Sequence, residues 1–201
     1  DNGRDLIYET SASNILQDEN SVSAIVLYQR VLGVTTVIPL PVNRVSYQVM
    51  GMDLSFNANT LAYAICETIG SEDHLQVYVH QPKSDAGEPW LVQSYPAEVC
   101  HEQKFDLALA GNGEVIAVSY PIESQQYQLM RIDLTTHTRT ILDEGNLGEK
   151  IDISATGEVV TYSKEIDGTS QIFIWDATRP ITASHNIIGR VTDETGHPLA
   201  L

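Results

Sequence analysis

One phrase occurs three times in this sequence, as MDLSFNANTLAYA (residues 52–64), FDLALAGNGEVIAV (residues 105–118) and IDISATGEVVTYS (residues 151–163). The opening DNGRDLIYETS (residues 1–11) matches the second half of the same phrase. Each copy runs from an apolar-Asp-apolar segment, through a turn of Asn, Gly, Ala and Thr, into an alternating apolar run. This order predicts a β-hairpin. The copies recur about 45 to 55 residues apart, a spacing that is typical of repeat architectures.

Two further strand signals follow each hairpin. The third strand alternates clearly, as in LQVYVHQ (residues 75–81), and the fourth is short, as in PWLVQSY (residues 89–95). Turn-forming residues separate these strands, and no stretch shows a sustained helical period. We expect strands at about residues 4–11, 23–30, 35–40, 50–56, 60–66, 75–81, 90–95, 104–109, 114–120, 127–134, 138–142, 150–154, 158–163 and 171–176.

Four-stranded antiparallel units repeated at this spacing are the blades of a β-propeller. We therefore expect an all-β fold with a propeller or partial propeller over residues 1–186, and a two-sheet β-sandwich is the alternative. Its four blades should cover about residues 1–43, 44–98, 99–146 and 147–186. The same register predicts that three residues lie on inner strands, namely Leu54, Leu107 and Ile153. It also predicts that three residues are buried in the second strands, namely Leu61, Ile116 and Val160.

The repeated pattern also resembles known blades. Asp-(Leu/Ile)-(Ser/Ala)-turn-Gly, followed by a strand such as QIFIWD (residues 171–176), is similar to TolB-like and WD-repeat-like propeller blades over residues 1 to about 186. The sequence departs from both families. No copy has the Ser-Pro-Asp-Gly turn of TolB-like blades, and the Trp-Asp dipeptide occurs once, at Trp175-Asp176, with no preceding Gly-His pair. The resemblance implies a divergent propeller.

The tail NIIGRVTDETGHPLAL (residues 186–201) resembles the opening of the carboxypeptidase-regulatory-like family of Ig-like sandwiches. The matching positions are Gly189, Val191, Asp193, Gly196, Pro198 and Leu199. This resemblance implies that residues 187–201 are the first strands of a truncated Ig-like domain. The alternative is a closing strand of the propeller.

The first blade begins inside its hairpin turn, so its inner strand is expected to come from elsewhere. An unpaired strand edge invites pairing with another strand. Three segments could cover it: a preceding part of the parent protein, the tail strand at residues 187–192, or a second copy in an edge-to-edge dimer.

Composition limits the partners. The 201 residues carry 27 acidic and 11 basic side chains, for a net charge of −16, so a nucleic-acid phosphate backbone would be repelled. The sequence contains no run of about 18 apolar residues, so no membrane span is predicted. The histidines do not show metal-ligand spacing, and neither a metal nor another cofactor is expected.

Three further sets of residues are candidates for structural or binding roles, and none of them forms a catalytic motif. Asp53, Asp106 and Asp152 recur at one place in the repeat, where a hydrogen bond to the backbone is favoured over convergence on a cation. Cys66 and Cys100 belong to neighbouring repeats and could meet across them. They would form either a disulfide or two separately buried thiols. Aromatic residues near blade ends are candidate binding residues, although packing between blades is their usual role; they are Trp90, Tyr95, Tyr120 and Tyr127.

Together these features favour a non-catalytic recognition or scaffolding propeller of a larger secreted or surface protein, with a protein or carbohydrate ligand and neighbouring domains in the same polypeptide. A bacterial extracellular or cell-surface location is expected, with the periplasm as the alternative. The resemblance to propeller-bearing peptidases implies a second hypothesis, an accessory propeller beside a hydrolase domain that lies outside these residues.

Overall fold

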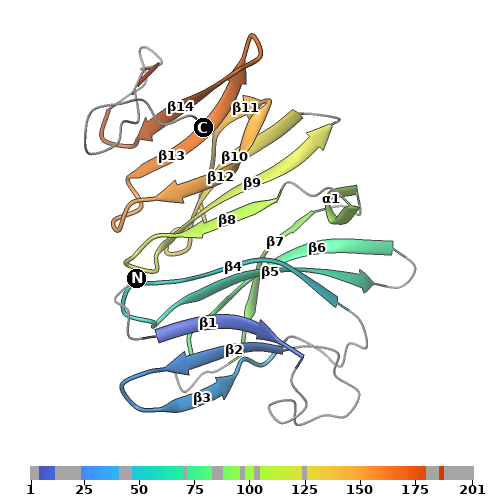
Figure 1. Ribbon diagram of the computed structural model, residues 1–201, viewed down its shortest axis with the longest axis vertical. Coiled ribbons are helices and arrows are strands. Elements are labelled where there is room, and N and C mark those ends of the chain that lie inside the picture. The colour runs from blue at the N-terminus through green and yellow to red at the C-terminus, as the bar shows by residue number, and fades with distance from the viewer. Residues whose placement is uncertain are drawn as a thin grey trace, which may run out of the picture.

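The computed structural model describes residues 5–11, 24–40, 47–69, 72–82, 88–95, 98–101, 105–123, 126–179 and 186–187. In these residues the fold is nearly all β, which confirms the predicted fold class. Four antiparallel sheets follow one another along the chain, the first with three strands and the others with four (Figure 1). In every sheet, strands that are consecutive in sequence are neighbours.

The strands have the following bounds. The first sheet contains β1 (Asp5–Thr10), β2 (Ala24–Gln29) and β3 (Val34–Val37), and the second contains β4 (Tyr47–Leu54), β5 (Leu61–Ile69), β6 (Glu72–His80) and β7 (Trp90–Tyr95). The third contains β8 (Asp106–Leu109), β9 (Val115–Glu123), β10 (Gln126–Asp133) and β11 (Arg139–Gly145). The fourth contains β12 (Leu147–Ile153), β13 (Val159–Ile166), β14 (Thr169–Asp176) and β15 (Asn186–Ile187).

Every expected strand has a counterpart, and the ends agree to within three residues. The single-turn helix α1 (Glu98–His101) was not expected from the sequence. The two-residue strand β15 pairs with β14 through Ile187 and Ile172, so it crosses the predicted boundary at residue 187. The Ig-like start predicted for the rest of the tail lies outside the described residues.

The hairpin turns of the last three sheets share one hydrogen-bond pattern. The backbone N–H groups of Ser55, Ala110 and Ser154 each donate to the carbonyl five residues later, at 2.8 to 2.9 Å. Leu54, Leu109 and Ile153 therefore occupy one position, and they pair with Leu61, Ile116 and Val160, respectively. Those three partners are fully buried, as predicted.

This register corrects the sequence alignment at one place. The residue equivalent to Asp53 and Asp152 is Ala108, and Asp106 lies two residues earlier in its strand. The copy at residues 105–118 carries two additional residues between its Asp and its turn. Because side chains alternate along a strand with a period of two, Asp106 still points to the same face as Ala108.

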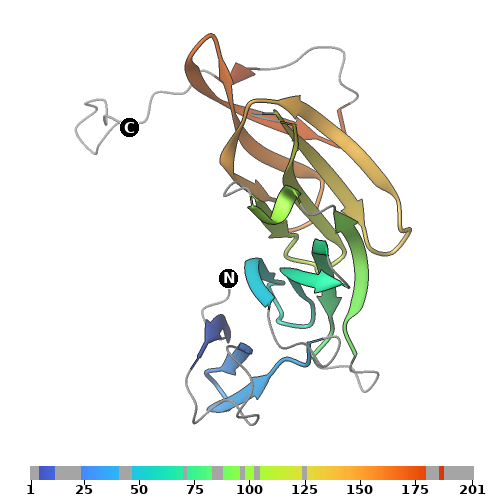
Figure 2. The same cartoon turned by 90° about the vertical axis from the view of Figure 1, so that its right-hand side faces the viewer.

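The apolar core is divided among the contacts between consecutive sheets. One cluster joins the first and second sheets, a second joins the second and third, and a third joins the third and fourth. The first and fourth sheets lie at opposite ends of the molecule in both views (Figures 1 and 2). The described sheets thus form an open arc of blades and not a closed ring.

Candidate functional site

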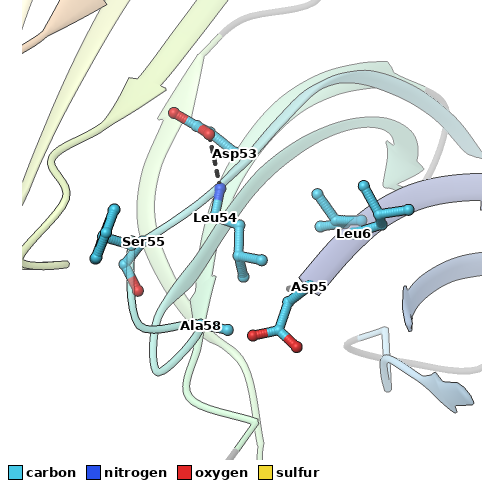
Figure 3. Close-up of a pocket in the computed structure, with 8 residues that line it drawn as sticks. Asp5, Leu6, Asp53, Leu54, Ser55 and Ala58 are labelled. Carbon is cyan, nitrogen blue, oxygen red and sulfur yellow. Dashed lines mark hydrogen bonds between the residues drawn. The ribbon is translucent and has the colours of Figure 1, made fainter. Parts of the chain in front are cut away.

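A pocket of about 210 Å³ opens between β1 and the end of β4. Its walls come from β1, from β4 and from the turn after β4, and the residues are Asp5, Leu6, Ile7, Asp53, Leu54, Ser55, Phe56 and Ala58. Figure 3 shows Asp5 and Leu6 on one side, with Leu54, Ser55 and Ala58 on the other. The pocket thus lies between two consecutive sheets, at the turn end of the inner strand β4.

The pocket coincides with a difference between the first sheet and the others. In the repeat, Leu6 precedes Tyr8 by two residues, as Leu61 precedes Tyr63. Leu61 and its equivalents, each of which pairs with a residue of an inner strand, are fully buried, but Leu6 is 54% exposed. In the described part of the chain β1 pairs only with β2, whereas β5, β9 and β13 each have strands on both sides. The pocket therefore lies beside a strand edge that no other described strand covers.

Exposed apolar side chains accompany this edge. Phe56, at the tip of the turn, is 56% exposed, and Leu6 is similarly exposed. Neither residue was singled out by the sequence analysis. The signal was present for Phe56, because the equivalent turn positions are Gly111 and Ala155, so that a bulky aromatic is unusual there.

Asp53 in the wall of the pocket serves the backbone. One carboxylate oxygen accepts a hydrogen bond from the N–H of Leu54 at 2.8 Å, and the other accepts one from the N–H of Leu109 in the next sheet, also at 2.8 Å. Burial raises the pKa of Asp53, and the two backbone hydrogen bonds oppose this effect. Both oxygens are thus engaged, and the bond from Leu109 joins the second sheet to the third.

The other two repeated aspartates differ in what they join. Asp106 accepts a hydrogen bond from the N–H of Ile151 in the fourth sheet at 2.9 Å, and its other oxygen lies 3.5 Å from Nζ of Lys150. Asp152 accepts one from the N–H of Ile153 in its own strand at 2.8 Å. Within the described residues, no group of three or more His, Cys, Asp or Glu side chains is placed to hold a metal ion.

The four candidate aromatic residues do not form one surface. The rings of Tyr95 and Tyr120 are in contact, with centroids 4.2 Å apart, and the Tyr120 hydroxyl donates to Gln128. Tyr95 is buried between the second and third sheets, and this burial raises its pKa. Tyr127 is buried between the third and fourth sheets, while Trp90 is 37% exposed. Of the four, Trp90 therefore offers the most surface to a ligand, and a binding role for the set stays a prediction.

Cys66 in β5 and Cys100 in α1 form a disulfide, with their Cα atoms 5.6 Å apart. Disulfides form and persist in oxidising compartments and are rare in the cytosol. The bond therefore indicates that the protein matures outside the cytoplasm. No helix in the described residues is both long and apolar enough to cross a membrane.

Comparison with known proteins supports the fold. No protein-family model and no curated protein sequence matches this chain. Among solved structures, TolB from Acinetobacter baumannii matches 87% of this chain and 38% of its own, at 14% identity and a TM-score of 0.53. Dipeptidyl peptidase 4 from Porphyromonas gingivalis matches 80% of this chain and 29% of its own, at 10% identity and a TM-score of 0.56.

A chain from the nidogen–laminin complex matches 90% of this chain and 60% of its own, at 10% identity and a TM-score of 0.52. All three are propeller structures, so the likeness shows that the sheets are divergent propeller blades. The chain spans less than two thirds of each matched chain.

Proposed function

We propose that this chain is a non-catalytic recognition module of a larger secreted or surface protein, and that it binds an extended protein segment along β1. The observation that carries the proposal is the edge of β1 next to a pocket, which no other strand of the described residues covers. A strand edge with free backbone groups can be extended by a peptide, whose main chain supplies affinity while side-chain pockets supply specificity.

The chemistry of the pocket defines the kind of segment. Exposed Leu6 and Phe56 favour an apolar side chain, because covering them removes apolar surface from water. The carboxylate of Asp5 at the rim and the net charge of −16 favour a basic residue nearby. The ligand is therefore an extended peptide in which apolar residues alternate with at least one Lys or Arg.

The proposal can be tested by selecting peptides from a displayed random library on the immobilised, disulfide-bonded chain. Peptides with this alternating apolar and basic pattern should be enriched. Phe56→Ala and Leu6→Ser should each weaken binding of the selected peptide by about tenfold in calorimetry, since a buried apolar anchor is worth more than 1 kcal/mol. The matched control is Ile141→Ala, because Ile141 on β11 is also 54% exposed but does not line the pocket.

Two results would contradict the proposal. One is that no peptide is enriched above the background of an unrelated acidic protein. The other is that Ile141→Ala weakens binding as much as Phe56→Ala does. Binding on a glycan array that requires Phe56, without any selected peptide, would replace the protein ligand by a carbohydrate.

The second hypothesis is an accessory propeller beside a hydrolase domain. The fold likeness to a dipeptidyl peptidase supports it, and the disulfide supports an extracellular, cell-surface or periplasmic location for either hypothesis. The complete reading frame separates the two. A hydrolase domain with an intact nucleophile and base next to these blades would favour the accessory role.

A further inference from the structure

In the part of the chain that the structure describes, the fourth sheet has one face packed on another sheet and one face that no other sheet covers. We call the face of a sheet that packs on the next sheet in sequence its forward face, and the opposite one its backward face. The backward face of the fourth sheet is buried against the third sheet through Tyr162 and Phe173. Since side chains alternate along a strand, the residues next to Tyr162 in β13 and next to Phe173 in β14 lie on the forward face. On that face Ile172 is 54% exposed and Ile174 is 38% exposed.

Register equivalence relates this free face to a covered one. In the second sheet, Ala62 pairs with Val79 and Ala64 pairs with Val77, and all four side chains are fully buried against the third sheet. In the fourth sheet, the equivalent pairs are Thr161 with Ile174 and Ser163 with Ile172. Both faces thus place small side chains on the second strand and branched aliphatic side chains on the third. The forward face of the fourth sheet has the composition of an interface between blades.

Asp152 completes the correspondence. It occupies the register position of Asp53, and each accepts the N–H of the following residue in its own strand at 2.8 Å. The second oxygen of Asp53 accepts an N–H from the inner strand of the next sheet. In the described part of the chain the second oxygen of Asp152 accepts no hydrogen bond, and the side chain is exposed.

We infer that the forward face of the fourth sheet is covered by a further four-stranded blade of the same polypeptide. The inner strand of that blade donates a backbone N–H to the free oxygen of Asp152. Its backward face supplies bulky aliphatic side chains over Ile172 and Ile174. The third sheet covers the second in this way, with Leu109, Ile116 and Val118.

A second copy of this chain fits the face less well. It would have to offer the backward face of its first sheet, where β1 and β2 carry Leu6 and Val26. The described part of that sheet has no strand before β1 to donate an N–H to Asp152. Val26 is moreover already fully buried within its own chain, so it has no surface left to cover a partner.

Thiol labelling tests the inference directly. Ile172→Cys and Ile141→Cys place single free thiols at two positions with the same 54% exposure, and the native cysteines stay in their disulfide under non-reducing conditions. Each variant is prepared in this 201-residue chain and in the polypeptide encoded by the complete reading frame. In the short chain both thiols should react at similar rates with a water-soluble disulfide reagent.

In the complete polypeptide, the thiol at position 172 should react at least about tenfold more slowly than in the short chain, because labelling of a covered side chain requires opening of the interface. The thiol at position 141 should keep its rate. Adding Asp152→Ala should restore part of the lost reactivity at position 172. Equal reactivity at 172 in both forms would overturn the inference, as would a reading frame that encodes no further blade. Protection of position 172 in the short chain that grows with protein concentration would also overturn it, in favour of a second copy.

Discussion

At the scale of single residues, the hairpin turns combine an unusual backbone conformation with close contact between sheets. Ala58, Gly113 and Gly157 occupy the same turn position, all with positive φ, at 55°, 77° and 75°. A Cβ atom at Gly113 would lie 2.8 Å from Cβ of Thr60, and one at Gly157 would lie 2.6 Å from Cβ of Val115. Each contact is with the preceding sheet, so glycine here serves both the turn and the packing between blades.

Gly113→Ala and Gly157→Ala are therefore expected to lower the free energy of unfolding by about 2–4 kcal/mol, from backbone strain together with overpacking. Gly168→Ala is the matched control, because Gly168 has a φ of 74° but nothing within 4 Å of its would-be Cβ. It should cost only about 1 kcal/mol, from strain alone. Urea unfolding followed by circular dichroism measures these differences. Equal losses at all three positions would show that the contacts between sheets do not matter.

The aspartate bridges form the second prediction at this scale. Asp53→Ala leaves the N–H groups of Leu54 and Leu109 without their acceptor in a partly buried setting, and should cost about 1–3 kcal/mol. Asp152→Ala in this chain removes one hydrogen bond at an exposed site, and should cost no more than about 0.5 kcal/mol. Chemical denaturation of both variants checks the difference. A loss at Asp152 as large as at Asp53 would contradict a bridging role between sheets.

At the scale of elements, the helix α1 depends on the disulfide. A single turn of four residues cannot be stable by its own hydrogen bonds. The bond from Cys100 to Cys66 attaches this turn to β5, and it closes a loop with a sequence separation of 34 residues. Reduction should therefore release the segment between the second and third sheets.

Replacing both cysteines by alanine is expected to lower the free energy of unfolding by about 2–4 kcal/mol, because the unfolded chain regains the freedom that the closed loop removes. Limited proteolysis should then cut first near residues 98–101. Addition of a reductant should destabilise the original protein to the same extent and leave the cysteine-free variant unchanged. If the reductant alters neither protein, the disulfide does not support the fold.

At the scale of the whole molecule, stability should be distributed unevenly along the arc. The second and third sheets are covered on both faces, and their strands β5 and β9 contain runs of fully buried residues. In β1, by contrast, accessible residues dominate. In the first half of β13, buried and more accessible residues alternate, and accessible ones follow. Local opening costs the most free energy where burial is greatest.

Native-state hydrogen exchange should consequently show amides in β5 and β9 protected at least about tenfold more than those in β1 and β13. Comparison of the amide rates at two denaturant concentrations distinguishes local opening from global unfolding. Uniform protection of all four strands would mean that the arc unfolds as a single cooperative unit.

Local features of the sequence determined the strands, their order and the repeated hairpin. Alternation and turn residues act over a few positions, so they can be recognised without knowledge of the fold. The buried positions Leu61, Ile116 and Val160 follow from the same register. The resemblance to propeller blades also depended on this short-range pattern, which is retained although the identity to the matched structures is only 10% to 14%.

Only the tertiary structure decided what meets across the sheets. The displacement of Asp106 by two residues, the pairing of Cys66 with Cys100, and the pocket beside Leu6 and Phe56 all depend on contacts between segments far apart in sequence. A shift of two residues preserves the face of every side chain in a strand, so the sequence pattern is almost the same in either alignment. The hydrogen bonds from one inner strand to the next distinguish the two, and these exist only once the sheets have packed.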